Sequence, residues 1–516
     1  INEYEGPSDI PYTGRGISYH LGNNTGLVHS FIDSNNVING QRYFYAISSY
    51  DHGTKIMGIG PSESSKTITL NPETNEIFLD VNTAVVIPRS PAAGYVKGAV
   101  SYYDSLSFIK HLSGFGTGTF SIEVLDPRAI EDTNTFQITF KDNPIRYSVE
   151  DLNPIVETRV SKKNVFITLQ KNRLNADRFI LKNDGATMIM GKDYLLFPDA
   201  GQVVVTDTLN SQIADGDQIT IEYTYYPLWE SSRLNNEESN AVFDGIKIYA
   251  YNKKLSLDKE KTKWSDGSSG NYQITVGPYD GKQSNMRPAD YEIRWFDSIA
   301  DTSSLGNATA PFQIWDVTPG KIPFKKKIVV LDYKIRNQTW DLGESVVILE
   351  EGAGINPSWQ FDIQEPINDV RNDAVEGDIF YVATDRPFNN KDIYQFQMMA
   401  SSIQSENNEG LLDDIRVVPN PYVVTNILEP LDRQNPRDRG PRRIYFDKLP
   451  NECTIRIYTI TGELVKTIYH NTTFDNGQEF WDLTTKDNFP IAFGIYIYHI
   501  DAGKMGEKIG RLAIIK

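Results

Sequence analysis

The strongest constraint on the fold of this chain is a two-residue alternation of side chains near its C-terminal end. In residues 454–458 (TIRIY) apolar and polar residues alternate, which is the period of a half-buried β-strand. Gly462 follows in a short polar turn, where glycine adopts a positive φ without strain. Residues 464–468 (LVKTI) then predict the returning strand. An α-helix would need an apolar period of 3.6 residues, so the sequence predicts a β-hairpin here.

A second hairpin is predicted immediately downstream. Residues 493–500 (FGIYIYHI) and 508–515 (KIGRLAII) are rich in β-branched and aromatic side chains, and the glycines of residues 503–506 predict the turn between them. The two hairpins together predict a small all-β domain over residues 413–516.

Several short motifs of this domain occur in a fixed order. They are Asn420, Pro421 and Tyr422 near its start, Gly462 in the first hairpin, Trp481, then Gly494 and Tyr496, and finally Lys516. In this order they resemble the motifs of the Ig-like C-terminal sorting domain of type IX secretion substrates. The resemblance implies export through the periplasm to the outer cell surface of a Gram-negative bacterium. It also implies the type IX secretion machinery as a partner.

Charge and size limit what the rest of the chain can be. A net charge of −17 disfavours nucleic acid and anionic membrane surfaces as partners. No apolar run is long enough to span a membrane. The 516 residues exceed one hydrophobic core, and 28 Tyr and 24 Phe favour strands over helices. A single cysteine, Cys453, excludes an intramolecular disulfide framework.

The predicted fold class is therefore all-β, with Ig-like and fibronectin-like β-sandwich domains in series. The turn and strand signals divide the chain into a fibronectin-like part (1–60), two β-domains (61–150 and 151–230), a β-sandwich (231–400), a polar linker (401–412) and the sorting domain (413–516).

The first of these parts resembles the end of a fibronectin type III domain. Asn39 and Gly40 predict a turn, and Tyr43 follows where such domains place a tyrosine corner. The resemblance implies that the Tyr43 hydroxyl bonds to nearby backbone. A whole domain of this kind takes about 90–100 residues, so we expect that its early strands lie upstream of Ile1, come from another chain or are missing.

One segment offers hard oxygen ligands for a cation. Residues 332–344 (DYKIRNQTWDLGE) loosely resemble a calcium loop, with Asp332, Asn337, Asp341 and Glu344 as candidate ligands. The alternative is a hairpin turn without a metal. Calcium is the one cofactor that the sequence suggests.

Catalytic motifs are not found. The six histidines show no metal-ligand spacing, and neither HExxH nor GxSxG occurs. Trp264, in a polar turn, is the tryptophan that we expect as an exposed ligand contact. The sequence thus predicts a chain that is not an enzyme.

Two functional hypotheses remain open. The first is a secreted, non-catalytic structural or adhesion protein of the cell surface, which assembles with other copies or other surface proteins by strand addition. The second is the non-catalytic C-terminal tail of a larger secreted hydrolase whose catalytic domain lies upstream.

Overall fold

The computed structural model describes residues 31–49, 57, 62, 64–65, 67–70, 77–101, 108–209, 211–235, 240–352, 354–367, 369–404, 410–423 and 442–515. In these ranges the regular structure consists of strands and of short 3₁₀ turns, which confirms the predicted all-β class. The turns are η1 (Ala176–Arg178), η2 (Pro198–Ala200), η3 (Tyr279–Gly281), η4 (Gln283–Asn285) and η5 (Gly503–Met505). None of the helical turns in the described ranges is long and apolar enough to cross a membrane.

The chain forms two compact units, which are described separately. Unit 1 comprises Ile1–Ala99, Asp126–Asp132 and Met399–Lys516, and unit 2 comprises Val100–Leu125 and Thr133–Met398.

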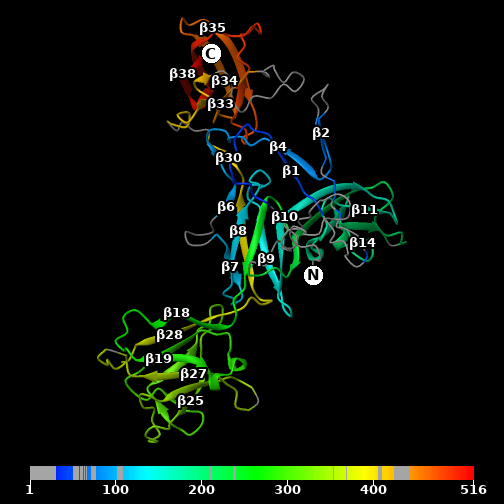
Figure 1. Cartoon of the computed structure of the whole chain (residues 1–516). Helices are drawn as coiled ribbons and strands as arrows, with labels where there is room; N and C mark the ends of the chain where they lie inside the picture. Colours follow the sequence, from blue (N-terminus) through cyan, green and yellow to red (C-terminus); the bar gives the residue numbers. More distant parts are fainter. Residues whose placement is uncertain are drawn as a thin grey trace. The chain divides into compact units, whose positions relative to one another are not determined.

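The largest sheet of unit 2 is built around its two longest strands, β10 and β16, and Figure 1 labels β10 and its neighbour β9. Its strands are, in spatial order, β13 (Ala186–Thr187), β12 (Ile180–Asn183), β16 (Gln218–Ser231), β10 (Arg146–Val160), β9 (Thr135–Lys141), β29 (Ile393–Met399) and β6 (Ala99–Ser101), with β7 (Lys110–Ser113) also beside β29. In β9 every second residue is buried, so the strand shows the alternation that its sequence predicts.

Two prolines lie inside the long strands of this sheet. Pro154 of β10 falls where the pairing with β16 shifts between Asp151 and Ile155. Pro227 of β16 falls in the same irregular stretch of the partner strand. Because proline donates no ladder hydrogen bond, it is tolerated in a strand at such bulges. The two strands therefore remain one ladder despite residues that normally end a strand.

Two smaller sheets adjoin this region. One consists of β11 (Phe166–Thr168), β15 (Gln202–Val205) and β14 (Tyr194–Phe197), and the other of β8 (Thr119–Val124) and β17 (Ile246–Tyr251). Side chains of β14 and β15 share a buried core with those of β12 and β16.

The strand pairing corrects the predicted division of the chain. The expected boundary at residue 150 falls inside β10. The proline and the acidic residues of this strand are typical of a loop, so the sequence does not indicate a strand there. In addition, β29 of the predicted 231–400 domain pairs with β9 of the predicted 61–150 domain. The predicted domains at 61–150, 151–230 and 231–400 are therefore interleaved through shared sheets. Long-range pairing of this kind leaves no local signal in the sequence.

The remainder of unit 2 is a β-sandwich. One sheet has the order β18 (Ser256–Trp264), β28 (Ile379–Asp385), β20 (Tyr291–Trp295), β23 (Phe312–Asp316) and β24 (Phe324–Lys325). The other has the order β19 (Gln273–Pro278), β27 (Pro357–Gln364), β26 (Ser345–Leu349) and β25 (Lys327–Leu331), and β21 (Asp301–Thr302) pairs with β22 (Thr309–Ala310). Buried side chains from both main sheets form one hydrophobic core.

The prediction for Trp264 is wrong. Its indole packs against this core, edge-on to Phe380 at a centroid distance of 5.4 Å, and its Nε1 donates to the Tyr272 carbonyl at 3.1 Å. The polar residues that follow Trp264 suggested an exposed turn, but the strand period places the ring inward.

A buried ion pair lies at the end of β28. The guanidinium of Arg386 contacts the carboxylate of Asp290, and both side chains are only 5% exposed. Arg386 Nε also donates to the Phe115 carbonyl at 2.6 Å, and Asp290 Oδ1 accepts from the Thr384 amide at 2.8 Å. The pair therefore joins the segment before β8 to the sandwich, with its polar atoms hydrogen-bonded.

A second buried carboxylate, that of Asp378, makes the stability of the sandwich depend on pH in the acid range. Burial alone would raise the pKa of Asp378, but the backbone amides of Ser269, Gly270 and Val375 donate to its oxygens, and the pKa lies below its usual range. A lowered folded-state pKa adds stability above the unfolded pKa of about 3.9, which is lost as the pH falls through the folded value.

We therefore expect Asp378→Asn to lower the free energy of unfolding by about 1–3 kcal/mol at pH 7 and to reduce its decline below about pH 4. Urea denaturation at pH 7 and pH 3 measures both effects. Asp266→Asn, an exposed change in the same turn region, is the control. Equal acid dependence in the Asp378 variant and the parent would contradict the assignment.

Unit 1 contains short pairs and a C-terminal sandwich. The pairs are β1 (Tyr43–Ala46) with β4 (Thr83–Val86), β2 (Ile68–Leu70) with β3 (Ile77–Leu79), and β5 (Tyr95–Val96) with β30 (Ser402–Ile403). The sandwich has one sheet of β31 (Arg416–Val418), β33 (Ile444–Asp447) and β36 (Glu479–Trp481), and a second of β32 (Tyr422–Val423), β38 (Glu507–Ile515), β37 (Gly494–Asp501), β34 (Glu452–Thr459) and β35 (Leu464–Asn471).

The predicted fibronectin-like part (1–60) is described only from residue 31 onward. Within it, the Ile38 amide donates to the Tyr43 hydroxyl at 2.8 Å, and that hydroxyl donates to the Asn36 carbonyl at 3.4 Å. The predicted bond between the Tyr43 hydroxyl and nearby backbone is confirmed. Tyr43 lies in β1, whose partner β4 belongs to the next predicted domain.

Candidate functional site

The aromatic residues of the predicted sorting motif meet in the core of the C-terminal sandwich. Tyr422, Trp481 and Tyr496 come from three different strands and are all buried in one cluster. Trp481 and Tyr496 are edge-on at a centroid distance of 6.0 Å, and Trp481 Nε1 donates to the Thr484 carbonyl at 2.8 Å. These motif positions therefore hold the two sheets together, since each ring fills space between them.

Asn420 hydrogen-bonds to β38, the last strand of the described residues. Its side-chain amide donates to the Arg511 carbonyl at 3.0 Å, and its side-chain carbonyl accepts from the Ala513 amide at 3.1 Å. Pro421 follows, and β32 then runs parallel to β38, with Tyr422 opposite Ile514. Residues 420–423 at the start of the domain thus hold β38 through side-chain and backbone hydrogen bonds.

The remaining motif residues are turn or end positions. Gly462 has φ of 88° in the turn between β34 and β35, and its amide donates to the Thr459 carbonyl, as the sequence predicts. Gly494 has φ of 152° and opens β37. Lys516 lies outside the described residues. The structure therefore brings Asn420, Tyr422, Trp481 and Tyr496 into one domain core or its edge, with the glycines at its turns.

A segment from far upstream docks onto this domain. Residues 90–95, here called the docking segment, contact the loops around Leu449 and residues 474–477. The amides of Ala92 and Ala93 donate to the carbonyls of Phe474 and Leu449 at 2.9 Å each, and the Gly477 amide donates to the Ser90 carbonyl at 2.7 Å. The sequence does not predict this contact, and the small residues of the segment (SPAAGY) are the one signal that could have suggested close packing.

The docking segment also holds the predicted linker. The Gln404 amide donates to the Gly94 carbonyl at 2.8 Å, and β30 pairs with β5, which begins at the last residue of the docking segment. At the other end of the predicted linker (401–412), Leu412 is buried in the core of the sandwich. The linker prediction is therefore corrected at both described ends. Its polar composition suggested a connection without contacts to the rest of the chain. Composition alone does not indicate hydrogen bonds to distant backbone.

Gly477→Ala should loosen this contact. A Cβ at this position would lie 2.4 Å from the Pro91 carbonyl oxygen, so backbone must shift. We expect a loss of about 1–3 kcal/mol in unfolding free energy and faster amide exchange at Ala92 and Ala93. Hydrogen exchange measured by mass spectrometry tests this. Gly277→Ala, which meets no atom within 4 Å, is the matched control; unchanged exchange in the Gly477 variant would contradict the expectation.

The four predicted calcium ligands lie in the loop between β25 and β26. Glu344 is fully buried; its Oε1 accepts from the amides of Tyr333 and Lys334, and its Oε2 accepts from the Asp341 amide. Asp332 Oδ2 accepts from the Gln338 amide, and Asn337 Nδ2 donates to Asp341 Oδ2. Both Glu344 oxygens and Asp332 Oδ2 thus hold the loop, whereas Asp332 Oδ1 is buried without a hydrogen-bond partner. The described residues contain no cluster of three or more His, Cys, Asp or Glu side chains suited to a metal. The β25–β26 connection has the antiparallel pairing of the hairpin alternative, and calcium binding stays a prediction.

Two residues of the C-terminal domain with reactive side chains, Cys453 and His470, have structural roles. Burial raises the pKa of the Cys453 thiol to about 12, so the thiolate is scarce at neutral pH. His470 is buried, with Nδ1 3.0 Å from Glu479 Oε2 and Nε2 3.1 Å from the Thr472 hydroxyl. Both residues therefore serve the packing of the sandwich.

The fold and the site define a multidomain all-β protein with a C-terminal β-sandwich. No protein-family profile matches the sequence, and no curated protein does. Two solved structures can be compared. One is PorZ of Porphyromonas gingivalis, an essential bacterial surface component of the type IX secretion system, with 12% identity and a TM-score of 0.18 over 89% of this chain. The other is dimeric latent PorU of the same organism, with 11% identity and a TM-score of 0.14 over 78% of this chain.

The chain spans 63% of the length of the PorZ structure and 34% of the PorU structure. At these TM-scores no residue role is carried over from either protein.

Proposed function

We propose that the chain is a secreted, non-catalytic protein of the outer cell surface, exported by type IX secretion with residues 413–516 as its address. The order of the motif residues supports the address, as does their convergence on one folded core. The structural use of Cys453 and His470 supports a non-catalytic role.

The observation that carries the proposal is the fixation of the last strand by Asn420. An export address at a C-terminus must be presented in a defined conformation if a receptor is to recognise its surface. Here a residue from the first motif holds both a carbonyl and an amide of the final strand. Assembly with other copies by strand addition stays a prediction. In β35, the edge strand of the five-stranded sheet, the Val465 carbonyl already accepts from the Lys486 amide.

The proposal is tested by giving the full chain a periplasmic signal peptide and expressing it in a bacterium that uses type IX secretion. Protease shaving of intact cells measures the surface fraction. We expect a surface location in the parent strain and periplasmic retention in a strain without the type IX translocon. Surface location in both strains would contradict the proposal. A chain that ends at residue 412 is the control for the address.

A further inference from the structure

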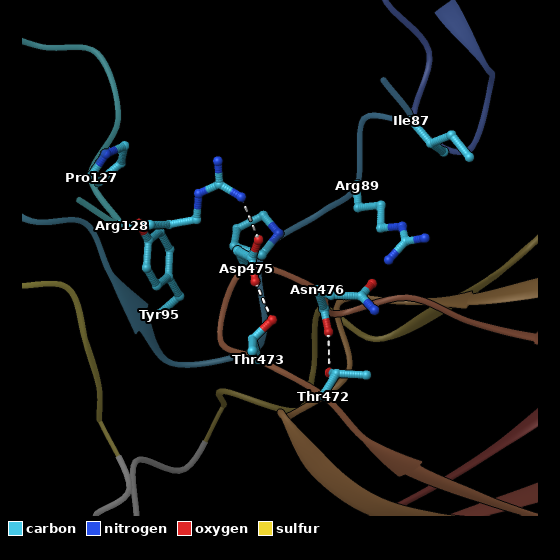
Figure 2. Close-up of a pocket in the computed structure, with 10 residues that line it drawn as sticks. Ile87, Arg89, Tyr95, Pro127, Arg128, Thr472, Thr473, Asp475 and Asn476 are labelled. Atoms are coloured by element: carbon cyan, nitrogen blue, oxygen red, sulfur yellow. Dashed lines mark hydrogen bonds and ion pairs between the residues drawn. The ribbon is translucent and has the colours of Figure 1, made fainter. Parts of the chain in front are cut away.

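Two adjoining hollows lie beside the C-terminal sandwich, within unit 1. The larger has a volume of about 700 Å³ and the smaller about 250 Å³, and Ile87, Arg89 and Asn476 line both. Figure 2 shows the larger hollow, with residues near the docking segment facing the loop of residues 472–476. Because the hollows share a wall, they form one groove, which can hold a ligand longer than a single ring.

Arginines dominate the charge of this groove. Arg42, Arg89 and Arg443 line the smaller hollow, and Arg89 and Arg128 line the larger. The lining contains two carboxylates, Asp475 and Glu479. Four arginines against two carboxylates make the groove cationic in a chain whose net charge is −17. Such a local reversal of charge concentrates anions at the groove.

Both carboxylates are already engaged. Asp475 forms an ion pair with Arg128 at 3.2 Å, and the Thr473 hydroxyl and Arg128 lower the pKa of this carboxyl (Figure 2). Glu479 is 3.0 Å from His470 Nδ1. By contrast, Arg42 and Arg89 are exposed and have no ion pair or hydrogen bond with any residue that the structure describes. Two arginines that have no partner among the described residues, on the wall of one hollow, provide charge for an external anion.

The groove also offers aromatic and amide surfaces. Arg443 lies over the rings of Tyr445 and Phe480, at 5.4 and 5.9 Å, and the Phe480 side chain is half exposed. Asn476 and Gln478 place side-chain amides on the same wall. Stacking faces together with amide hydrogen bonds suit the apolar faces and hydroxyls of a sugar. Arginines suit its carboxylate, sulfate or phosphate groups because the guanidinium binds such groups in a bidentate manner.

We propose that this groove binds an acidic oligosaccharide, with its anionic groups on Arg42, Arg89 and Arg443 and a sugar face on Phe480. The proposal does not rest on the route of export. It adds a ligand site, formed from residues of β33 and β36, of the segment before β1 and of neighbouring loops.

Isothermal titration calorimetry with the full chain tests it. The probes are tri-galacturonic acid, its trimethyl ester, a heparin-derived tetrasaccharide, inorganic sulfate and a short single-stranded DNA. We expect saturable binding of at least one acidic saccharide, and at least tenfold weaker binding of the ester than of the acid wherever the acid binds. Sulfate and DNA should bind at least tenfold more weakly than that saccharide.

The decisive variant is Arg42→Gln/Arg89→Gln, which changes two exposed side chains that have no partner in the described ranges. It should weaken saccharide binding at least tenfold with an unchanged thermal unfolding temperature. Arg371→Gln, an exposed arginine of the sandwich in unit 2, is the control and should bind as the parent does. Failure of both acidic saccharides to bind would overturn the proposal. It would also be overturned by equal binding of the acid and its ester, of sulfate or DNA, or of the double variant.

Discussion

Arg386→Ala is expected to lower the free energy of unfolding of unit 2 by about 3–5 kcal/mol, because it leaves the carboxylate of Asp290 buried without its counter-charge. The change also removes the bond from Arg386 Nε to the Phe115 carbonyl. The loss falls on the connection between the segment before β8 and the sandwich, so we expect the sandwich to become separately susceptible to proteolysis.

Urea denaturation followed by tryptophan fluorescence measures the loss, since most tryptophans of the chain belong to this sandwich. Arg371→Ala, which removes exposed ion pairs with Glu365 and Asp373, is the matched control and should cost less than about 1 kcal/mol. Replacing both partners, as Arg386→Met with Asp290→Leu, should cost less than Arg386→Ala alone, because no lone charge remains buried. A double variant that is less stable than Arg386→Ala would show that the unpaired carboxylate is not the cause.

Trp481→Ala is the second change with a large expected effect. The indole is 1% exposed between the two sheets of the C-terminal sandwich, and its removal should cost about 3–5 kcal/mol. If residues 413–516 are the export address, the destabilised domain should also reduce the surface fraction several-fold. Thermal unfolding and protease shaving of intact cells measure the two effects on the same variant.

Two further variants separate folding from recognition. Tyr469→Ala removes an aromatic side chain that is 78% exposed on the same sandwich, so stability should change little and export should persist. Trp481→Phe keeps a ring in the core and should retain part of both properties. Normal export of an unfolded Trp481→Ala domain would show that the machinery reads the sequence rather than the folded surface.

The local hairpins could be predicted from the sequence, and the reason is that their signals are local. The turn at Gly462 and the alternation on either side of it specify β34 and β35 without reference to the rest of the chain. The same holds for β37 and β38. The Tyr43 hydroxyl bond was also predictable, because it joins residues close in sequence.

The elements that depend on distant partners were not predictable. The sequence pattern does not predict β10 as one strand, because proline normally ends a strand. Only the pairing of β10 with β16 shows that Pro154 lies at a bulge. In the sequence, the polar neighbours of Trp264 suggest an exposed turn. In the structure, the strand alternation places the indole against the core. The cationic groove joins Arg42, Arg89, Arg128 and Arg443, which no spacing rule connects. In the calcium-like loop, residue types suggested ligands, and the sequence does not show that Glu344 and Asp332 Oδ2 accept backbone amides of the loop.

The docking segment has a consequence for the order in which unit 1 can form. Its hydrogen bonds join residues near the beginning of the chain to Leu449, Phe474 and Gly477 near its end. Contacts of such high sequence separation form late, because a very long loop must close first. Unit 1 therefore closes only after the last strands have been made, and a chain interrupted before them keeps apolar surface exposed to proteases. Closure of unit 1 thus requires residues 449–477, which gives chains that contain them a kinetic advantage over shorter ones.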